Sequence, residues 1–537
     1  MQGSMRGQVT IRSSSLGEIL RRTPASAVLV IILLATIPAG ARAAAPNLTT
    51  SPDSAPLLTT VVVDGSTAYG APQLFAVYRD QLGQPISRDS AGAVADAIVS
   101  LYERDGYVKP EVTLDNSLTG RGVLRVQVHE AQISRVIFEG DAGRFRRQLD
   151  SVAARLEHSK PLRRDDIPAA LRELRQLAGV TITANPRRDT QVRNAFELAI
   201  RTEYSAVDGM VRMNNRGTEQ IGPAFILGQF SINGIAGRQG KLGLVFSAAS
   251  DHDEYLGGGL YFDTGFDNGS HFNALLFRSS SAPDEAPVDL DDTYTRERAS
   301  LRFSWPLRQE NSLSLAMSAA FDADDLVIAR DGFEFRDERL RIFEGGLRAS
   351  WRGDSPTQYS ANLQLRKGLD GLGAGLQALD LVDDPRRVDF LLTQLSATVY
   401  RRFATDWSVR LDALSQYSGD VLPDVERFKI GGDRLGRGFE VAEIAGDSGI
   451  GGKLELRRDL MNTEGIFGRL SAYGFYDIGA AWKQDMPGRE SAATAGTGLA
   501  IQGSTLTGYI EVAAPLTGPD IEGKQKASVF AELSYRF

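Results

Sequence analysis

Ser528-Val529-Phe530-Ala531-Glu532-Leu533-Ser534-Tyr535-Arg536-Phe537 is the stretch with which the chain ends, and its pattern has a period of two residues. Apolar residues take alternate positions: Val529, Ala531, Leu533, Tyr535 and Phe537. Ser528, Glu532, Ser534 and Arg536 fall between them. Because successive side chains of a β-strand point to opposite faces, the stretch predicts a strand with one apolar and one largely polar face.

The same alternation recurs from about residue 204 to the end of the chain. In 359–366, for example, Tyr359, Ala361, Leu363 and Leu365 alternate with Ser360, Asn362, Gln364 and Arg366. About sixteen such runs occupy about 330 residues, which is the spacing of strands and loops in an outer-membrane barrel. We therefore predict a mainly β fold, with a 16-stranded antiparallel transmembrane β-barrel over residues 204–537. A large soluble β-sandwich is the alternative, but the repeated polar faces would leave it too little core.

The composition agrees with a barrel and excludes several other classes of protein. The chain has 537 residues, of which 42% are hydrophobic and 24% charged, and its mean hydropathy is -0.20. Such a modest value is expected where lipid-facing and lumen-facing residues alternate. Because the chain has no cysteine, disulfides, thiolate metal sites and cysteine nucleophiles are excluded. The net charge of -8 gives no support to nucleic-acid binding.

The N-terminus has the features of an export signal. Basic residues come first: Arg12, Arg21 and Arg22. An apolar run at 25–38 follows, and Ala41-Arg42-Ala43 has the small residues that signal peptidase requires. The run is shorter than the ~20 residues that a membrane-spanning helix needs. We predict a signal peptide over 1–43 and a flexible tail, rich in Ser, Thr and Pro, over 44–56.

Two similar modules are predicted between the tail and the barrel, at 57–130 and 131–203. The first has a strand at 60–63, a helix that begins after Ser87 and ends at Gly106, and strands at 108–114 and 123–128. The second repeats this order with strands at 133–138, 180–184 and 195–201. Its helix has one apolar face and ends at Gly179; that face consists of Ile167, Leu171, Leu174 and Leu177. Each module is therefore a β-α-α-β-β unit.

A glycine-rich loop is predicted at 425–446. It contains Phe428-Lys-Ile-Gly-Gly-Asp-Arg-Leu-Gly-Arg-Gly-Phe439, and Gly474-Phe-Tyr-Asp-Ile-Gly479 follows about forty residues later. Glycines permit a tight backbone path, so Arg437 could reach deep into a barrel and meet one carboxylate. We predict that this carboxylate is Asp477. The alternative is that both are solvated charges in the lumen.

Together these features resemble the outer-membrane transporters of two-partner secretion, the haemolysin secretion/activation family. The two modules, with Gly106-Tyr107 after the helix, resemble polypeptide-transport-associated (POTRA) domains. Asn215-Arg216-Gly217-Thr218 is similar to the stretch by which the family's chains enter the barrel. Gly446-Asp447-Ser448-Gly449 resembles the start of the family's strand after the arginine loop. Two departures stand out. Gly436 replaces the usual β-branched residue, and the dozen or so residues left after cleavage make an N-terminal plug helix doubtful.

The resemblance implies roles for particular residues. A lock between loop and barrel would consist of Arg437, Gly438, Phe439, Asp477 and Gly479. Tyr535 and Phe537 would be the signal by which the barrel-assembly machinery recognises the last strand.

The implied function is transport across the bacterial outer membrane. The POTRA domains would recognise an unfolded, secreted partner exoprotein in the periplasm, and the lipid-embedded barrel would export it. Nucleotide hydrolysis is not expected, because the chain has no Gly-x4-Gly-Lys-Ser/Thr motif and no helix is predicted to follow the glycines of 371–375. A barrel-assembly insertase of the same superfamily is the alternative, and a passive porin is a weaker one.

An enzyme is not expected. None of the four histidines has a second ligand or a triad partner at a suitable local spacing; they are His129, His158, His252 and His271. The acidic pairs Asp251/Asp253 and Asp291/Asp292 are interpreted as solvated loops, since no EF-hand pattern surrounds them. We therefore predict no catalytic residues, no metal and no cofactor.

Overall fold

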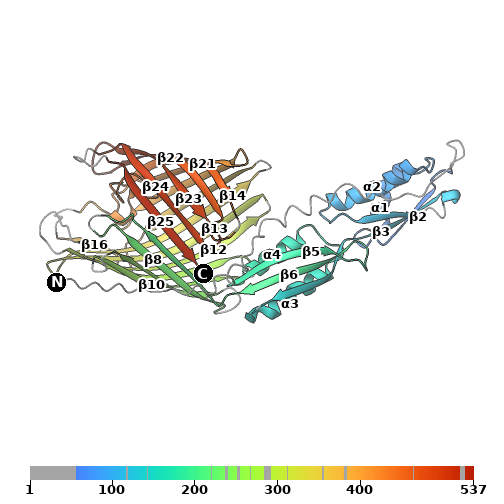
Figure 1. The fold of residues 1–537 in the computed structure, drawn as a ribbon, viewed down its shortest axis with the longest axis horizontal. Coiled ribbons are helices and arrows are strands. Elements are labelled where there is room, and N and C mark those ends of the chain that lie inside the picture. Colours follow the sequence, from blue (N-terminus) through green and yellow to red (C-terminus); the bar gives the residue numbers. More distant parts are fainter. Residues whose placement is uncertain are drawn as a thin grey trace, which may run out of the picture.

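The structure, a computed structural model, describes residues 56–537 except for short internal segments. These segments are 116–118, 142, 219–220, 236–239, 251–253, 267, 284–291, 311, 354–355, 380–383, 464 and 520–525. The predicted signal peptide and nearly all of the tail, on which the expectation about a plug helix depends, lie outside the described residues. The described residues form two small α+β domains in a row and a β-barrel, with the second domain at one end of the barrel (Figure 1).

The first domain has the predicted β-α-α-β-β order. Its elements are β1 (Thr60–Asp64), α1 (Ala71–Tyr78), the 3₁₀ turn η3 (Arg79–Gln81), α2 (Arg88–Arg104), β2 (Glu111–Asp115), η4 (Thr119–Arg121) and β3 (Val123–His129). The sheet order is β1-β3-β2. Ser87 caps α2, since its Oγ accepts a hydrogen bond of 3.1 Å from the Ser90 amide. Apolar residues of α2, among them Val94 and Ile98, pack on β3 to form the core.

The second domain repeats this topology. Its elements are β4 (Gln132–Gly140), η5 (Gly143–Phe145), α3 (Arg146–His158), α4 (Asp166–Arg175), β5 (Val180–Arg188) and β6 (Ala195–Tyr204), with sheet order β4-β6-β5. The predicted apolar face is buried in the core, together with Leu149 and Val152 of α3, but α4 ends before the predicted helix does, so Leu177 lies just after it. Both sheets therefore leave the corresponding strand, β2 or β5, at an edge.

The segment after α2 connects the two domains. The Val108 amide donates to the Leu162 carbonyl at 2.9 Å, and the Arg164 amide donates to the Gly106 carbonyl at 3.0 Å. The Arg163 guanidinium lies 4.7 Å from the centre of the Tyr107 ring. The strand predicted to start at Val108 begins instead at Glu111, because this backbone pairs with the second domain first.

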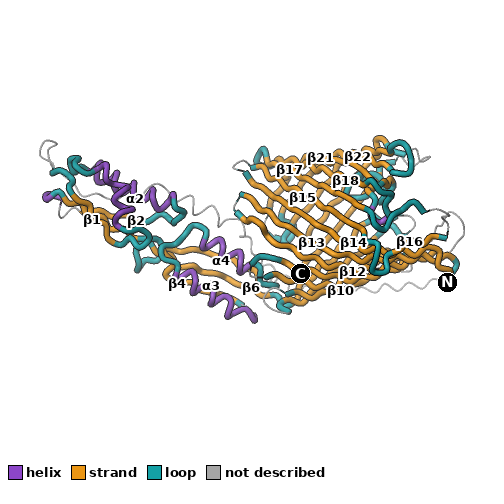
Figure 2. The backbone as a smooth tube through the Cα atoms, turned by 180° about the vertical axis from the view of Figure 1, so that it is seen from behind, coloured by secondary structure: helices purple, strands orange, loops and turns teal. Residues whose placement is uncertain are grey.

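The barrel is closed and antiparallel, with sixteen long strands in the described part of the chain (Figure 2). In chain order, the strands are β7 (Val207–Asn214), β8 (Phe225–Asn233), β9 (Lys241–Ala249), β10 (Tyr255–Gly265), β11 (His271–Ser281), β12 (Asp292–Gln309), β13 (Leu313–Arg330), β14 (Phe333–Arg352), β15 (Thr357–Gly368), β17 (Leu391–Arg402), β18 (Trp407–Ser418), β21 (Ser448–Asn462), β22 (Arg469–Trp482), β23 (Glu490–Gln502), β24 (Leu506–Thr517) and β25 (Ser528–Arg536). The short strand β16 (Gly375–Ala378) pairs with the far end of β14. The predicted fold class is confirmed.

The terminal strand closes the barrel. β25 pairs with β7 from Glu532 opposite Asn214 to Arg536 opposite Met210. Beyond this ladder, Phe537 exchanges two backbone hydrogen bonds with Gly209, at 2.9 and 3.0 Å. The predicted faces are confirmed: Leu533 and Tyr535 are exposed on the outer surface, and Ser534 is buried on the inner side.

The second domain contacts the rim of the barrel. Arg144 Nη1 donates to the Gly234 carbonyl at 2.8 Å, and Tyr204 Oη donates to the Asn233 carbonyl at 3.3 Å. Asn233 is the last residue of β8, and Gly234 follows it. These contacts place the second domain at one end of the barrel, and the first domain lies beyond it, farther from the barrel (Figure 1).

One prediction about acidic residues is wrong. Asp292 is the first residue of β12, and both of its oxygens accept hydrogen bonds from Arg330, at 2.8 and 2.9 Å. The fork geometry of the guanidinium gives this carboxylate a partner across the β12–β13 pair, so Asp292 does not lie in a solvated loop.

Asp251, His252, Asp253 and Asp291 lie outside the described residues. Within those residues, no helix is both long enough and apolar enough to cross a membrane.

Candidate functional site in the barrel lumen

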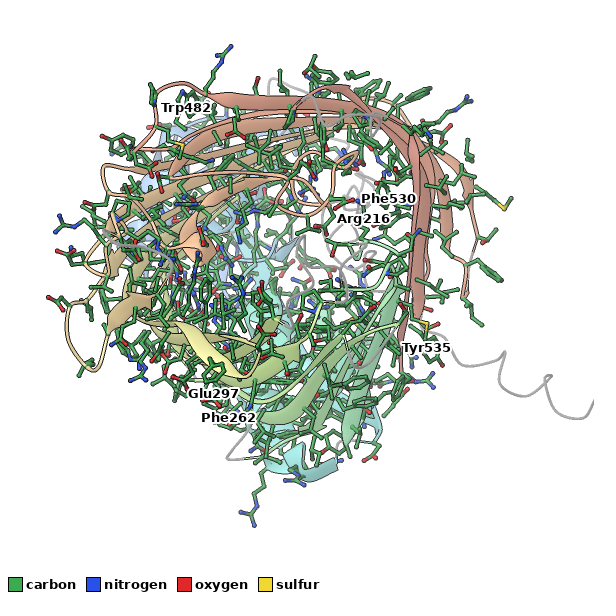
Figure 3. The ribbon with its side chains drawn as sticks, turned by 90° about the vertical axis from the view of Figure 1, so that its left-hand side faces the viewer. Arg216, Phe262, Glu297, Trp482, Phe530 and Tyr535 are labelled. Carbon is green, nitrogen blue, oxygen red and sulfur yellow. The ribbon has the colours of Figure 1, made fainter. Side chains whose placement is uncertain are left out.

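The segment between β18 and β21 folds into the barrel. It contains the turn η6 (Asp424–Glu426) and two short strands, β19 (Phe428–Ile430) and β20 (Ile444–Gly446). These strands pair with each other from Phe428 opposite Gly446 to Ile430 opposite Ile444. We call residues 419–447 the lumen loop. Figure 3 shows the barrel from the end that lies away from the two domains, with its side chains drawn inside and outside the wall.

An apolar cluster packs the lumen loop on the barrel wall. Its buried members are Phe428, Ile430, Leu435, Ile444, Ala481 and Ala492, and Leu414 and Phe439 pack against them. Gly479 on β22 leaves the space that the loop fills. A Cβ atom at this position would lie 3.0 Å from both Ile430 Cδ1 and Leu435 Cδ2, so a side chain there would push the loop from the wall.

Arg437 and Asp477 form the predicted contact at the tip of the lumen loop. Arg437 Nη2 lies 2.8 Å from Asp477 Oδ1, and Arg437 Nε lies 3.0 Å from Asp477 Oδ2. The residues are 6% and 0% exposed. The amides of Gly436 and Arg437 also donate to Oδ2, at 3.3 and 3.2 Å. Gly436 has φ +84°, a conformation that favours glycine and that directs these amides toward one oxygen.

Other groups of the barrel surround the Arg437 guanidinium. The centre of the Phe475 ring lies 3.5 Å from its central carbon. Nη1 lies 3.3 Å from Glu455 Oε2 and 3.8 Å from Glu511 Oε2. The arginine is therefore held by a bidentate carboxylate, a ring face and two further carboxylates, an environment that stabilises a partly desolvated cation.

Arg216, in the segment after β7, extends this network. Its guanidinium pairs with Glu511, and its Nε donates to Tyr509 Oη at 2.8 Å. Its Nη1 donates to the Arg437 carbonyl at 3.4 Å. The guanidinium also lies 4.0 Å from the centre of the Phe530 ring (Figure 3). The sequence marked Arg216 only as part of a family-like stretch, because no local spacing relates it to a residue 221 positions away.

The predicted loop residues meet in one place, whereas the predicted terminal signal lies elsewhere. A Cβ atom on Gly438 would come within 3.0 Å of the Pro515 nitrogen, so the loop backbone touches the wall closely. Phe439 packs into the apolar cluster. Tyr535 and Phe537 are exposed on the outside of the barrel, at the end where the chain finishes (Figure 1). Their rings stack with centres 5.8 Å apart.

The chemistry of this site is electrostatic fastening of a loop to a wall. The side chains that converge are arginines, carboxylates and aromatic rings. Among the described residues, no group of three or more histidine or acidic side chains could hold a metal ion. The described histidines, His129, His158 and His271, lie outside the lumen loop.

Comparison with known proteins gives one consistent picture. The sequence model of the haemolysin secretion/activation protein ShlB/FhaC/HecB matches residues 201–503. The outer membrane transporter CdiB of Escherichia coli is 24% identical over 516 residues, which cover 89% of this chain and 82% of CdiB.

Solved structures share the fold. CdiB from Escherichia coli superposes with a TM-score of 0.70 at 20% identity, covering 92% of both chains. CdiB from Acinetobacter baumannii gives 0.60 at 13% identity, covering 91% of both. BamA from Haemophilus ducreyi lacking POTRA domains 1-3 gives 0.53 at 12% identity, covering 90% of this chain and all of that one. These similarities extend through the domains as well as the barrel.

Proposed function

The chain belongs to the haemolysin secretion/activation protein family, and we propose on this basis that it exports one unfolded partner exoprotein through its barrel. The family consists of outer-membrane two-partner secretion transporters, and it is matched here over more than half of the chain. The protein is an outer-membrane β-barrel with POTRA domains in the periplasm. The finer steps of the proposal concern recognition, gating and energy.

The lumen loop carries the proposal for gating. It enters the barrel between β18 and β21, and its tip is fixed to β22 by Arg437 and Asp477. A passive porin has no need of such a fastening. We propose that this pair is the lock of a gate, and that the gate opens when the client displaces the loop. Gly438, Phe439 and Gly479 let the tip lie flat against the wall.

The edge strands support recognition by strand addition. β2 and β5 each pair with a single neighbour, and a helix packs on the same sheet in both POTRA domains. An extended peptide can add to such an edge through backbone hydrogen bonds, with only loose selection of its side chains. This suits a client that arrives unfolded.

Export without nucleotide hydrolysis completes the mechanism. The glycines of 371–375 lead into the short strand β16, whereas a phosphate-binding loop would open a helix. Folding of the client outside the cell would then provide the driving force.

The terminal strand supports a separate step, assembly of the barrel itself. β25 closes the barrel against β7, and Tyr535 and Phe537 present their rings on its outer face. We propose that the barrel-assembly machinery recognises these two residues before closure.

The proposal is tested by removing the transporter from the cells that make it and restoring it from a plasmid. Mass spectrometry of the medium should show one large exoprotein lost and then regained. The abundance of other outer-membrane barrels, measured in the same cells, should stay unchanged. A medium that keeps all its proteins would refute export, and a general loss of other barrels would identify an assembly factor instead.

A further inference from the structure

The base of the lumen loop is held by a different part of the wall from the tip. Leu340 and Ile342 of β14 face inward, and they are 2% and 1% exposed although barrel lumens are usually polar. They pack with the base of the loop and with the segment before β17. The buried members of this cluster are Leu340, Ile342, Phe390, Leu392 and Leu422, and Leu376, Val388 and Val425 are partly buried against them.

A bidentate ion pair lies beside this cluster. Arg366 of β15 places Nε 2.9 Å from Glu426 Oε2 and Nη2 2.9 Å from Glu426 Oε1. Its remaining nitrogen, Nη1, lies 2.5 Å from Glu344 Oε2 and 3.5 Å from Asp322 Oδ2. Glu426 belongs to the lumen loop, whereas the other three residues belong to the wall. Arg366 therefore joins the loop to β13 and β14 as well as to its own strand.

Glu426 balances the charge of this part of the wall. Arg302 lies 2.7 Å from Glu344, and Arg298 lies 3.6 Å from Asp322. Among the described residues, this cluster thus joins three arginines, Arg298, Arg302 and Arg366, to three carboxylates, Asp322, Glu344 and Glu426. If the loop left, the wall would keep three positive and two negative charges. Separating a well-paired, largely buried carboxylate from its arginine is costly, so the cluster retains the base of the loop.

We infer that Arg366 and Glu426 form a second latch of the lumen loop, independent of the Arg437–Asp477 pair, and that Arg366 is a positioning residue for the gate. The tip is held by β21, β22 and β24, whereas the base is held by β13, β14 and β15. In the barrel order β17, β18 and β21 separate β15 from β22. The loop therefore bridges two regions of the wall, and each latch holds its own end of the loop when the other is broken.

The inference rests on the proposed function only in taking the lumen loop as the gate, and the latch itself can be measured without a client. The chain has no cysteine, so a single Leu422→Cys substitution provides one thiol. Leu422 is 0% exposed, and the thiol should react with a maleimide only when the base of the loop leaves the wall. Labelling rates are measured on the purified, folded barrel in detergent, with heat-modifiable migration as the criterion of folding.

Glu426→Gln, which keeps the shape and removes the charge, should raise the labelling rate about tenfold, the factor that corresponds to about 1.4 kcal/mol. Arg437→Ala alone should leave the rate within about twofold, because it breaks only the tip. Single-channel conductance should rise more in the Glu426→Gln/Arg437→Ala double variant than the sum of the two single changes. Glu310→Gln, which breaks an exposed ion pair with Arg308, is the matched control and should change neither readout.

Unchanged labelling in Glu426→Gln would overturn the second latch. So would labelling in Arg437→Ala as fast as in the double variant, since the base would then depend on the tip. If Leu422→Cys does not fold, Val425→Cys replaces it in the same cluster. Arg366→Lys keeps the charge and loses the fork, so it should label at an intermediate rate, and a wild-type rate would count against the bidentate contact. A medium that keeps all its proteins in the cell-based test, with these labelling rates as expected, would refute the transporter proposal and leave the latch intact.

Discussion

Asp477 shows how closely the lumen loop and the wall depend on each other at the scale of single residues. Its carboxylate is fully buried, and both oxygens accept hydrogen bonds from the loop tip. A buried carboxylate is expensive unless it is paired and hydrogen-bonded. Removal of Arg437 would leave that charge without its main partner, and removal of Asp477 would leave the guanidinium with the weaker contacts of Glu455 and Glu511.

We expect Arg437→Ala to reduce export per inserted transporter at least about tenfold, because the remaining carboxylate destabilises the loop as it is now placed. Asp477→Ala should reduce export by a similar factor through the same lost contact. The double substitution should cost little more than either single one, since each already breaks the shared interaction. Secreted client is measured against the amount of barrel in the outer membrane.

Arg434→Ala is the matched control, since it removes an exposed arginine of the same loop and should leave export unchanged. Charge exchange, Arg437→Asp with Asp477→Arg, should restore little, because the shorter aspartate cannot span the distance that the arginine covers. Losses that simply multiply in the double variant would show that the two residues act independently, and the lock would have to be abandoned.

The sequence predicts the strands better than it predicts what the lumen contains. A period of two residues identifies the barrel because the apolar phase must face lipid along every strand. This period cannot show that positions of β14 facing the lumen also carry apolar residues, which pack against the lumen loop. Ile342 and Phe343 are adjacent, and only the structure shows that Ile342 is buried inside whereas Phe343 is exposed outside. Apolar residues on the polar phase are the signal that could have indicated this cluster.

The sequence also indicates one contact of the lumen loop, that of Arg437, better than the other, that of Arg366 with Glu426. Gly436 and the glycines near it suggested a buried path for Arg437, and one aspartate in a glycine-flanked strand suggested its partner. Arg366 and Glu426 lie 60 positions apart, and neither has a glycine directly beside it in the sequence, as Arg437 has. Charged residues are common on the inner face of a barrel, so no sequence pattern selects which of them meet.

At the scale of the element, β25 closes the barrel against β7, and our proposal is that the assembly machinery recognises this strand first. We expect removal of Phe537 to lower the amount of barrel in the outer membrane severalfold, because the terminal ring is proposed to be part of the assembly signal. The ring also packs against Phe230, with centres 5.8 Å apart, and lies over Gly209. The measurement is heat-modifiable barrel in outer-membrane fractions.

Phe537→Tyr, which keeps the aromatic ring, is the control and should assemble as the wild type does. Binding of the client to the POTRA domains should not change in either variant, since the proposed binding edges, β2 and β5, do not include the terminal strand. An unchanged abundance of folded barrel after the deletion would show that Phe537 is not needed for assembly.

At the scale of the whole molecule, the two POTRA domains and the barrel with its lumen loop follow one another along the proposed direction of transport. The two POTRA domains continue one another through Tyr107 and Arg163, and the second of them contacts the barrel rim through Arg144. The second domain, with its edge strand β5, is therefore held at the periplasmic end of the barrel, and the first domain lies farther out (Figure 1), while the lumen loop occupies the barrel. Under the proposed function, a client that is recognised on the domains would be delivered to the end of the barrel from which it enters the lumen.

Deletion of residues 57–202 should separate recognition from insertion. The barrel keeps its sixteen strands and its terminal Phe537, so we expect it to insert, whereas export of the client should fall to background because no edge strand remains to bind it. Arg437→Ala provides the contrast: this variant should still retain the client on purified outer membranes without exporting it, and the deletion variant should do neither. Client protein is therefore measured in the medium and in membrane pull-downs from the same cells. Export by the deleted barrel at the level of the intact transporter would mean that the client reaches the lumen without the POTRA domains, and their role as receptor would be refuted.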